Sequence, residues 1–431
     1  MTPAFGLVTA LGLFLGLIAV GMPVPFAIFL PGMAYLFFLT GWTGLKALGF
    51  ISWANLNNFT LTAIPLFILM AQILENSGLI GRTYKSLAKL LSPIPGGLLQ
   101  ANIVGCAMFA AVSGSSVTTA AAIGTTALPQ LMQRGYHKPL AAGSLAAGGT
   151  LGILVPPSLA MIVYSIFTET SVAKLFMAGI VPGILLSLMF MTYIGIRCTM
   201  NSAIAPRERG PSSIRDALKL SLDLLPIGLL IGVTIGSMYA GWATPTEAAT
   251  EGCALAMVLA MTVGDLSLPG FLLALRRSVL VVGNLMFLIF AAYVFSHAIS
   301  FGGVGETVTG YVIGLHLSRT EFFLFLFVLY TVMGALVESV GMIVITVPLI
   351  VPMLSHYGIN PIWFGIVLVV FIEMGQISPP IGINLFVIQS LWRGTLSDVV
   401  LGTIPFHMLM FVLLLALVAW PAIALWLPSK L

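Results

Sequence analysis

The sequence predicts an all-α polytopic membrane protein of two inverted-topology repeats, each with five transmembrane crossings and one re-entrant helical hairpin. Three observations predict it: an apolar composition, Gly and Pro residues that recur at one fixed spacing, and a one-sided distribution of basic residues. Of the 431 residues, 59% are hydrophobic and 7% are charged, a balance typical of chains with a large lipid-facing surface. This composition excludes a soluble fold.

The first half of the chain contains apolar segments long enough to cross about 30 Å of hydrocarbon. They lie at residues 5–21, 24–40, 57–77, 140–167 and 174–197. Segment 140–167 is interrupted at Gly148-Gly149-Thr150 and at Pro156-Pro157, so we expect a broken helix there. Basic residues recur at helical spacing over 79–92, which predicts an amphipathic helix in the membrane interface.

Two shorter apolar segments, at about 97–112 and 117–133, flank the polar sequence Ser113-Gly114-Ser115-Ser116. Each segment is short for a complete crossing. Basic residues occur before the first segment, at Lys85 and Lys89, and after the second, at Arg134 and Lys138. Because both outer ends favour the same aqueous face, we expect a hairpin over 97–133 that enters and leaves the membrane on one side.

A fixed spacing of 223 residues relates the two halves. At this offset Ser116 aligns with Ser339, and Pro156-Pro157 aligns with Pro379-Pro380. Further matches in the same register are Pro129 with Pro352, Gly135 with Gly358, Gly152 with Gly375, Gly179 with Gly402, and Pro182 with Pro405. One match alone is weak in a chain with 45 Gly and 25 Pro, but a common register indicates an internal repeat.

The register divides the chain into a first repeat at 1–205, a linker at 206–218 and a second repeat at 219–431. In the second repeat it places crossings at 220–241, 245–263, 278–300, 361–391 and 398–427, an interfacial helix near 303–318 and a hairpin at 321–355. Segment 361–391 is the second broken helix. Because the first repeat has an odd number of crossings, the second starts on the opposite side of the membrane, and the repeats are inverted.

The 17 Lys and Arg residues are distributed unevenly over this topology. One side carries Arg82, Lys85, Lys89, Arg134, Lys138, Arg197, Arg207, Arg209, Arg215, Lys219, Arg276, Arg277 and Arg393, and the other carries Lys46, Lys174, Arg319 and Lys430. By the positive-inside rule the first side, with the linker, is cytoplasmic, and both termini lie outside. This bias accounts for the net charge of +4, so we expect no nucleic-acid partner.

The interruptions in the predicted helices form the candidate functional site. Irregular backbone is tolerated at membrane depth only where protein or a water-filled cavity satisfies it. The hairpin tips, 113–116 and 338–341, and the breaks opposite them, 149–158 and 375–380, are therefore predicted to meet near the membrane midplane. Hydroxyl and backbone oxygens there suit a hard cation such as Na⁺, and helix N-termini suit a carboxylate.

Other interpretations of these residues stay open. Small and hydroxylated residues in membrane helices also serve helix packing, which is how we interpret Thr118 and Thr119. Glu338 and Glu373 lie at apparent membrane depth, either as ion ligands or proton carriers, or as protonated groups that lock a tip or helix. The dispersed Cys and His residues predict no transition-metal site, and no nucleophile constellation or phosphate loop indicates an enzyme.

Three motifs together are similar to a known family: AIPLFILM at 63–70, the tip at 113–116, and GGTLGILVPPS at 148–158. They resemble the large membrane subunit of TRAP (tripartite ATP-independent periplasmic) transporters, and GQISPPIG at 375–382 resembles its second-repeat counterpart. The likeness covers essentially the whole chain. It implies a multi-pass protein of the bacterial inner membrane, with periplasmic termini, that imports organic acids such as C4-dicarboxylates or sialic acid with Na⁺ by an elevator movement and without a cofactor.

The resemblance also implies partners and site residues. The expected partners are a separate small membrane subunit of about four spans and a periplasmic substrate-binding protein. The implied sodium-binding residues are Ser115, Ser116, Gly149, Thr150, Gly152, Ser339, Gly341, Gly375, Gln376 and Ser378. The implied substrate-binding residues are Ser113, Pro156, Pro157, Glu338, Pro380 and Asn384. The sequence does not separate side-chain from backbone ligation.

Two other functions fit the same sequence. A stand-alone Na⁺/dicarboxylate symporter of related architecture would transport without partners. A passive channel or a membrane scaffold would not respond to a Na⁺ gradient.

Overall fold

The computed structural model describes residues 3–206, 210–334, 337–392 and 394–430, and these residues form helices and connecting turns. Positions 335–336 of the predicted second hairpin lie outside the described residues. So do positions 207–209 of the predicted linker, with Arg207 and Arg209, and the basic residue Arg393.

The first half of the chain begins with three helices, continues through an amphipathic helix and ends in a long one. Its elements are α1 (Pro3–Ala19), α2 (Val24–Thr40), α3 (Trp42–Leu56), the 3₁₀ helix η1 (Phe59–Thr62), α4 (Ala63–Asn76), α5 (Leu79–Leu91), α6 (Leu98–Ser113), α7 (Ser116–Gln133), α8 (Lys138–Leu154), α9 (Leu159–Thr168) and α10 (Val172–Met200). Helix α3 is not predicted from the sequence, because its 15 residues mix apolar with polar and Gly positions and are short for a crossing.

The second half follows the same general plan. Its elements are α11 (Ile214–Leu222), α12 (Leu225–Tyr239), α13 (Pro245–Thr262), α14 (Leu268–Phe301), α15 (Val304–Gly314), α16 (Arg319–Gly334), α17 (Ser339–His356), α18 (Pro361–Gln376), α19 (Ile383–Trp392), α20 (Leu396–Ala419), α21 (Ala422–Leu425) and η2 (Pro428–Lys430). Helix α14 begins at Leu268 and not at the predicted 278, because Ser267 caps it and the helix includes Arg276 and Arg277. Helix α20 ends before the predicted 427, because Pro421 cannot continue its hydrogen bonding.

Corresponding helices of the two halves begin at the predicted spacing. Helices α7 and α17 begin at Ser116 and Ser339, and each has 18 residues. Helices α8 and α18 begin at 138 and 361. The turns after α7 and α17 each contain a left-handed glycine, Gly135 with φ +72° and Gly358 with φ +58°. The observed helix boundaries therefore agree with the register of the Gly and Pro residues.

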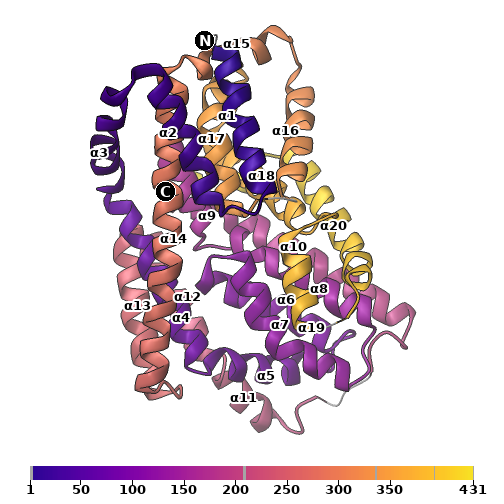
Figure 1. Ribbon diagram of the computed structural model, residues 1–431. Helices are drawn as coiled ribbons and strands as arrows, with labels where there is room; N and C mark the ends of the chain where they lie inside the picture. The colour runs from indigo at the N-terminus through magenta and orange to yellow at the C-terminus, as the bar shows by residue number, and fades with distance from the viewer. Residues whose placement is uncertain (1–2, 207–209, 335–336, 393, 431) are drawn as a thin grey trace.

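The long helices lie in two groups (Figure 1). The panel group consists of α2, α3, α4, α12, α13 and α14, in which α14 packs on α2 and α4, and α13 packs on α4 and α12. The core group consists of α6 to α10 and α16 to α20, in which α8 packs on α6, α7 and α20. Helix α5 packs on both α6 and α11 at one end of the molecule.

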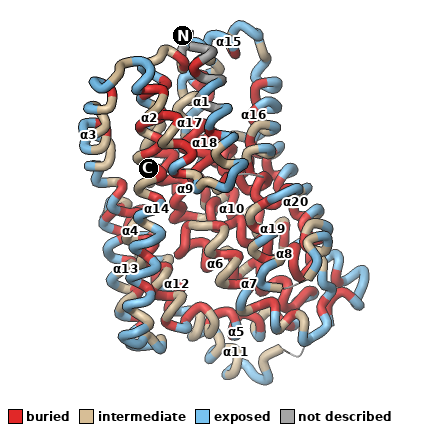
Figure 2. The backbone as a smooth tube through the Cα atoms, in the orientation of Figure 1, coloured by how far each residue is buried: buried red, intermediate tan, exposed pale blue. Residues whose placement is uncertain are grey.

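Two helices of the core group are buried on all sides (Figure 2). In α8 every residue from 140 to 154 is buried, and in α18 every residue from 363 to 376 is buried. A helix that is buried around its whole circumference belongs in the interior of a large or membrane-embedded protein. Helices α8 and α18 are the first parts of the two segments predicted to be broken, and they form the centre of the core group. The predicted interruption at Gly148-Gly149-Thr150 is wrong, because α8 continues through these residues to Leu154 and ends only before the Pro pair. In the second half, 375–376 belong to α18 and 339–341 to α17, so the break starts later and the turn ends earlier than predicted.

Six helical stretches among the described residues are long and apolar enough to cross a membrane. They are Phe59–Asn76, Lys138–Thr168, Val172–Met200, Leu268–Phe301, Ser339–His356 and Leu396–Ala419, and the bent pair α11 and α12 is a seventh candidate. The protein is thus an all-helical, multi-span membrane protein. The ten predicted crossings require shorter helices as well, such as α1 and α2, and this number stays a prediction.

Substituting Gly143 with Ala should destabilise the protein. Helix α8 meets α20 here so closely that a Cβ atom at Gly143 would lie 2.1 Å from the carbonyl oxygen of Gly402. Overpacking of this kind costs about 1–3 kcal/mol, so the melting temperature in detergent should fall. Gly228→Ala in α12 is the matched control, because a Cβ atom there meets nothing within 4 Å. Equal melting temperatures of the two variants would contradict this packing.

Candidate functional site

The connection between α6 and α7 is a short turn at 113–116, which we call the first turn. Gly114 adopts the left-handed conformation with φ +62°, and Ser115 caps α7 by accepting a hydrogen bond from the backbone N–H of Thr118 at 3.5 Å. The hydroxyl groups of Ser113 and Thr119 form a 2.7 Å hydrogen bond across the turn. Its shape is therefore fixed by its own polar groups.

The first turn packs on the break between α8 and α9, which we call the first break (155–158). The backbone N–H of Leu159 donates to the carbonyl oxygen of Gly114 at 3.2 Å. Gly152 makes room for the turn, because a Cβ atom there would lie 2.4 Å from the carbonyl oxygen of Ser115. The turn and the end of α8 thus form one packed unit.

Proline residues in the first break remove hydrogen-bond donors from the end of α8. Pro156 and Pro157 cannot donate to the carbonyl oxygens four residues earlier, at Gly152 and Ile153. The Ser158 hydroxyl donates to the Ile153 carbonyl at 2.7 Å instead. The Gly152 carbonyl has lost its i+4 donor at the position where α8 touches the first turn, which is where a cation would find backbone oxygens.

The second half repeats this arrangement between α16, α17 and α18. The second turn joins α16 to α17, and residues 337 and 338 of it are described. The end of α16 touches α18 backbone to backbone, because a Cβ atom at Gly375 would lie 2.8 Å from the Cα atom of Gly334. In the second break (377–382), Ser378 donates through its hydroxyl to the Met374 carbonyl at 2.7 Å.

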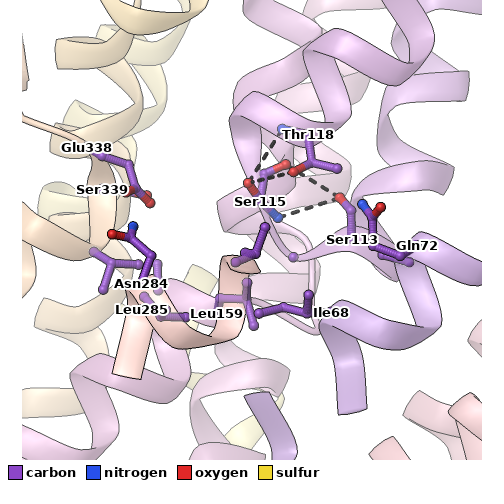
Figure 3. Close-up of a pocket in the computed structure, with 15 residues that line it drawn as sticks. Ile68, Gln72, Ser113, Ser115, Thr118, Leu159, Asn284, Leu285, Glu338 and Ser339 are labelled. Carbon is purple, nitrogen blue, oxygen red and sulfur yellow. Dashed lines mark hydrogen bonds between the residues drawn. The ribbon is translucent and has the colours of Figure 1, made fainter. Parts of the chain in front are cut away.

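A cavity of about 100 Å³ lies where the two turns face the panel group (Figure 3). The core group supplies one part of its wall: Ser113, Gly114, Ser115, Thr118, Leu159, Ala160, Glu338, Ser339 and Val340. The panel group supplies the rest from α4 and α14: Ile68, Ala71, Gln72, Val281, Asn284 and Leu285. Turns from both halves of the chain therefore meet at one cavity.

The wall of this cavity is polar but carries almost no charge. Among the described residues that line it, Glu338 is the only one with an acidic side chain, and none is Lys, Arg or His. An anionic ligand would be bound there by hydroxyl and backbone N–H groups, at the start of α7 for example, and not by a basic side chain.

The predicted site residues divide into residues that line the cavity and residues that do not. Ser113, Ser115, Glu338 and Ser339 line it. A second set is buried and does not line it: Ser116, Gly149, Thr150, Gly152, Pro157, Gly341, Gly375, Gln376, Ser378 and Asn384. Pro156 lines a separate apolar pocket between α6, α10 and α12, and Pro380 is exposed.

Three polar side chains on α18 and α19 contain buried atoms without a hydrogen-bond partner among the described residues. They are both carboxyl oxygens of Glu373, both amide atoms of Gln376 and Oδ1 of Asn384. The amide nitrogen of Asn384 donates to the Ala146 carbonyl of α8 at 3.4 Å. Buried polar groups are rarely unpaired in folded proteins, so these atoms favour a ligand or water near the second break. Glu373 makes no hydrogen bond here that would lock α18.

Comparison with known proteins decides the family. The family model described as "Tripartite ATP-independent periplasmic transporter, DctM component" matches residues 11–423. The chain belongs to this DctM family. The resemblance read from the motifs is thereby confirmed, and this DctM-family permease is a transporter component and not an enzyme.

Individual proteins agree with this assignment. The C4-dicarboxylate TRAP transporter large permease protein DctM of Pseudomonas aeruginosa is 36% identical over 376 residues, which cover 87% of each chain. The isethionate TRAP transporter permease protein DctMQ of Oleidesulfovibrio alaskensis is 30% identical over 96% of this chain and 65% of its own length. The YdaH transporter structure of Alcanivorax borkumensis gives a TM-score of 0.61 over 90% of both chains at 16% identity, so that likeness is one of fold alone.

Two carboxamides of the cavity wall, Gln72 and Asn284, are absent from the predicted site. They lie within the apolar predicted crossings 57–77 and 278–300. Their position could have identified them as candidate site residues from the sequence, because polar groups at membrane depth are disfavoured unless they have a function. Thr118, interpreted from the sequence as a packing residue, also lines the cavity of this permease, and its hydroxyl donates to that of Ser115 at 3.2 Å.

Proposed function

We propose that this DctM-family permease is the large permease subunit of a Na⁺-coupled importer of organic acids, such as C4-dicarboxylates or sialic acid. A periplasmic substrate-binding protein delivers the substrate, and a small membrane subunit of about four spans completes the complex. The observation that carries the proposal is the cavity at which turns from both halves of the chain meet, on the boundary between the core group and the panel group.

The proposed topology has inverted repeats with α6–α7 and α16–α17 as re-entrant hairpins, in the inner membrane and with both termini in the periplasm. The matching helix starts at 116 and 339 and at 138 and 361 support the repeat. The excess of Lys and Arg on one predicted side supports the orientation. Helix α5, whose Arg82 pairs with Asp265 at 3.3 Å beyond the end of α13, belongs to that basic side.

The proposed Na⁺ sites lie where each turn meets its break. The first is formed around Ser115, Ser116, Gly149, Thr150 and Gly152, and the second around Ser339, Gly341, Gly375, Gln376 and Ser378. The loss of i+4 donors at the Pro pairs supports backbone ligation, because a hard cation prefers oxygen ligands. The unpaired amide of Gln376 supports the second site.

The proposed substrate site is the cavity itself, between Ser113 on one side and Glu338 on the other. Pro157 and Asn384 are buried and do not line it, and Pro156, in a separate pocket, and the exposed Pro380 are not part of the proposed site. No basic side chain among the described lining residues balances an anion. Bound Na⁺ would supply the missing positive charge, so Na⁺ and carboxylate would each raise the affinity for the other. The core group would then move against the panel group as an elevator, with the turns and their ligands carried together.

Uptake into proteoliposomes tests this function. With the small subunit and a loaded binding protein present, an inward Na⁺ gradient should drive accumulation of a labelled organic acid above its external concentration. Replacing Na⁺ with K⁺ should abolish accumulation. Uptake by this chain alone would instead identify a stand-alone Na⁺/dicarboxylate symporter, and accumulation that ignores the Na⁺ gradient would contradict the proposal.

Ser116→Ala and Ser339→Ala should each raise the Na⁺ concentration needed for half-maximal uptake. Both side chains are buried, at 1% and 5% exposure, at the start of the helix that follows each turn. Loss of one cation ligand worth about 1.4 kcal/mol corresponds to about a tenfold change. Ser187→Ala is the control, because Ser187 lies in α10 and donates to the Gly183 carbonyl at 2.8 Å. Unchanged Na⁺ activation in both variants would remove these hydroxyl groups from the sites.

A further inference from the structure

The panel group contributes two polar side chains to the cavity, Gln72 from α4 and Asn284 from α14. The other panel residues of the wall are apolar: Ile68, Ala71, Val281 and Leu285. Figure 3 shows the Asn284 amide beside Glu338 and Ser339, and Gln72 beside Ser113. Each carboxamide therefore faces one of the two turns across the cavity.

Gln72 is oriented by a contact within its own helix. Its amide nitrogen donates to Oε2 of Glu75 at 3.0 Å, and Oε1 of Glu75 lies 3.9 Å from the Arg277 guanidinium of α14. Because a carboxylate only accepts hydrogen bonds, it selects the nitrogen end of the amide. An amide nitrogen has a second N–H group, and the Gln72 carbonyl oxygen has no partner among the described residues. The contact with Glu75 thus fixes Gln72 and leaves one N–H group and the carbonyl oxygen of its amide available to a ligand.

Carboxamides within apolar membrane crossings are disfavoured unless they meet a polar partner. In the described part of the chain Asn284 makes no hydrogen bond and is exposed, and Gln72 is half-buried. Both lie in apolar helical stretches long enough to cross the membrane, and both line the cavity. Packing therefore does not account for these two carboxamides, and a ligand in the cavity would contact both.

The chemistry of the two side chains selects the part of the ligand that they bind. A carboxamide offers both a donor and an acceptor and carries no charge, and a hydroxyl group has the same two capacities. A carboxylate only accepts hydrogen bonds, so it would leave the carbonyl oxygens of the two carboxamides without a donor. Resting on the proposed function, we infer that Gln72 and Asn284 are specificity-determining residues that bind a hydroxyl group of the substrate, while the turns and Na⁺ bind its carboxylate. The substrate class is then a hydroxylated organic acid.

Binding to the purified permease complex in Na⁺ tests this inference, measured by calorimetry with two probe pairs that each differ by one hydroxyl: malate against succinate, and lactate against propionate. The hydroxylated member of at least one pair should bind about fivefold tighter or more, since a hydrogen bond contributes about 1 kcal/mol. In Gln72→Leu or Asn284→Leu this preference should shrink toward equality. The Na⁺ affinity measured without substrate should stay unchanged, because neither residue lies at a turn–break contact.

Gln130→Leu in α7 is the matched control, since Gln130 donates to the Thr126 carbonyl of its own helix at 3.1 Å and is not in the cavity wall. Gln72→Met, which keeps the shape of the side chain, replaces Gln72→Leu if that variant does not fold. Equal binding within both pairs, or a preference that survives both cavity variants, would overturn the inference and leave the proposed function intact. Failure of all four acids to bind in Na⁺ would also overturn the inference, whereas the proposed function is tested separately by Na⁺-driven uptake in proteoliposomes.

Discussion

Backbone N–H and C=O groups inside a bilayer have to be satisfied within the protein, and the core group is arranged around this constraint. Helices α8 and α18 are buried on all sides and are followed by Pro pairs that remove donors from the end of the helix. The first turn packs on the end of α8 at Gly152, and the end of α16 packs on the end of α18 at Gly375. Irregular backbone is thereby collected in the centre of the protein, where its polar atoms can serve a ligand.

The absence of basic side chains from the described cavity wall connects this backbone arrangement with the proposed Na⁺-coupled transport. Among the described lining residues the cavity contains one carboxyl group, Glu338, and no basic side chain, so an anionic substrate needs positive charge from elsewhere. Cations at the turn–break contacts would provide it, and the binding of one ligand would then require the other. The panel group contributes only neutral side chains to the same space, which leaves the charge balance to the core group and its ions.

Much of the core group was predictable, because Gly and Pro act on the backbone locally. The register places Ser116 and Ser339 at equivalent positions, and both begin a helix in the structure. Side-chain direction was not predictable in this way. Gln72 lines the cavity only because α4 packs beside the core group, while Pro156 faces a different pocket. Helix α3 was missed because its mixed composition resembles a loop more than a crossing.

An experimental density map of the complex in lipid nanodiscs, determined once in Na⁺ and once in choline, would show whether the interrupted backbone holds the ions. We expect both turns to lie inside the membrane against the ends of α8 and α18. It also predicts ion density in Na⁺ alone, beside Ser115 and Gly152 and beside Gly375 and Ser378. Continuous helices through 113–116 and 337–339 that face lipid, or identical density in the two ions, would contradict it.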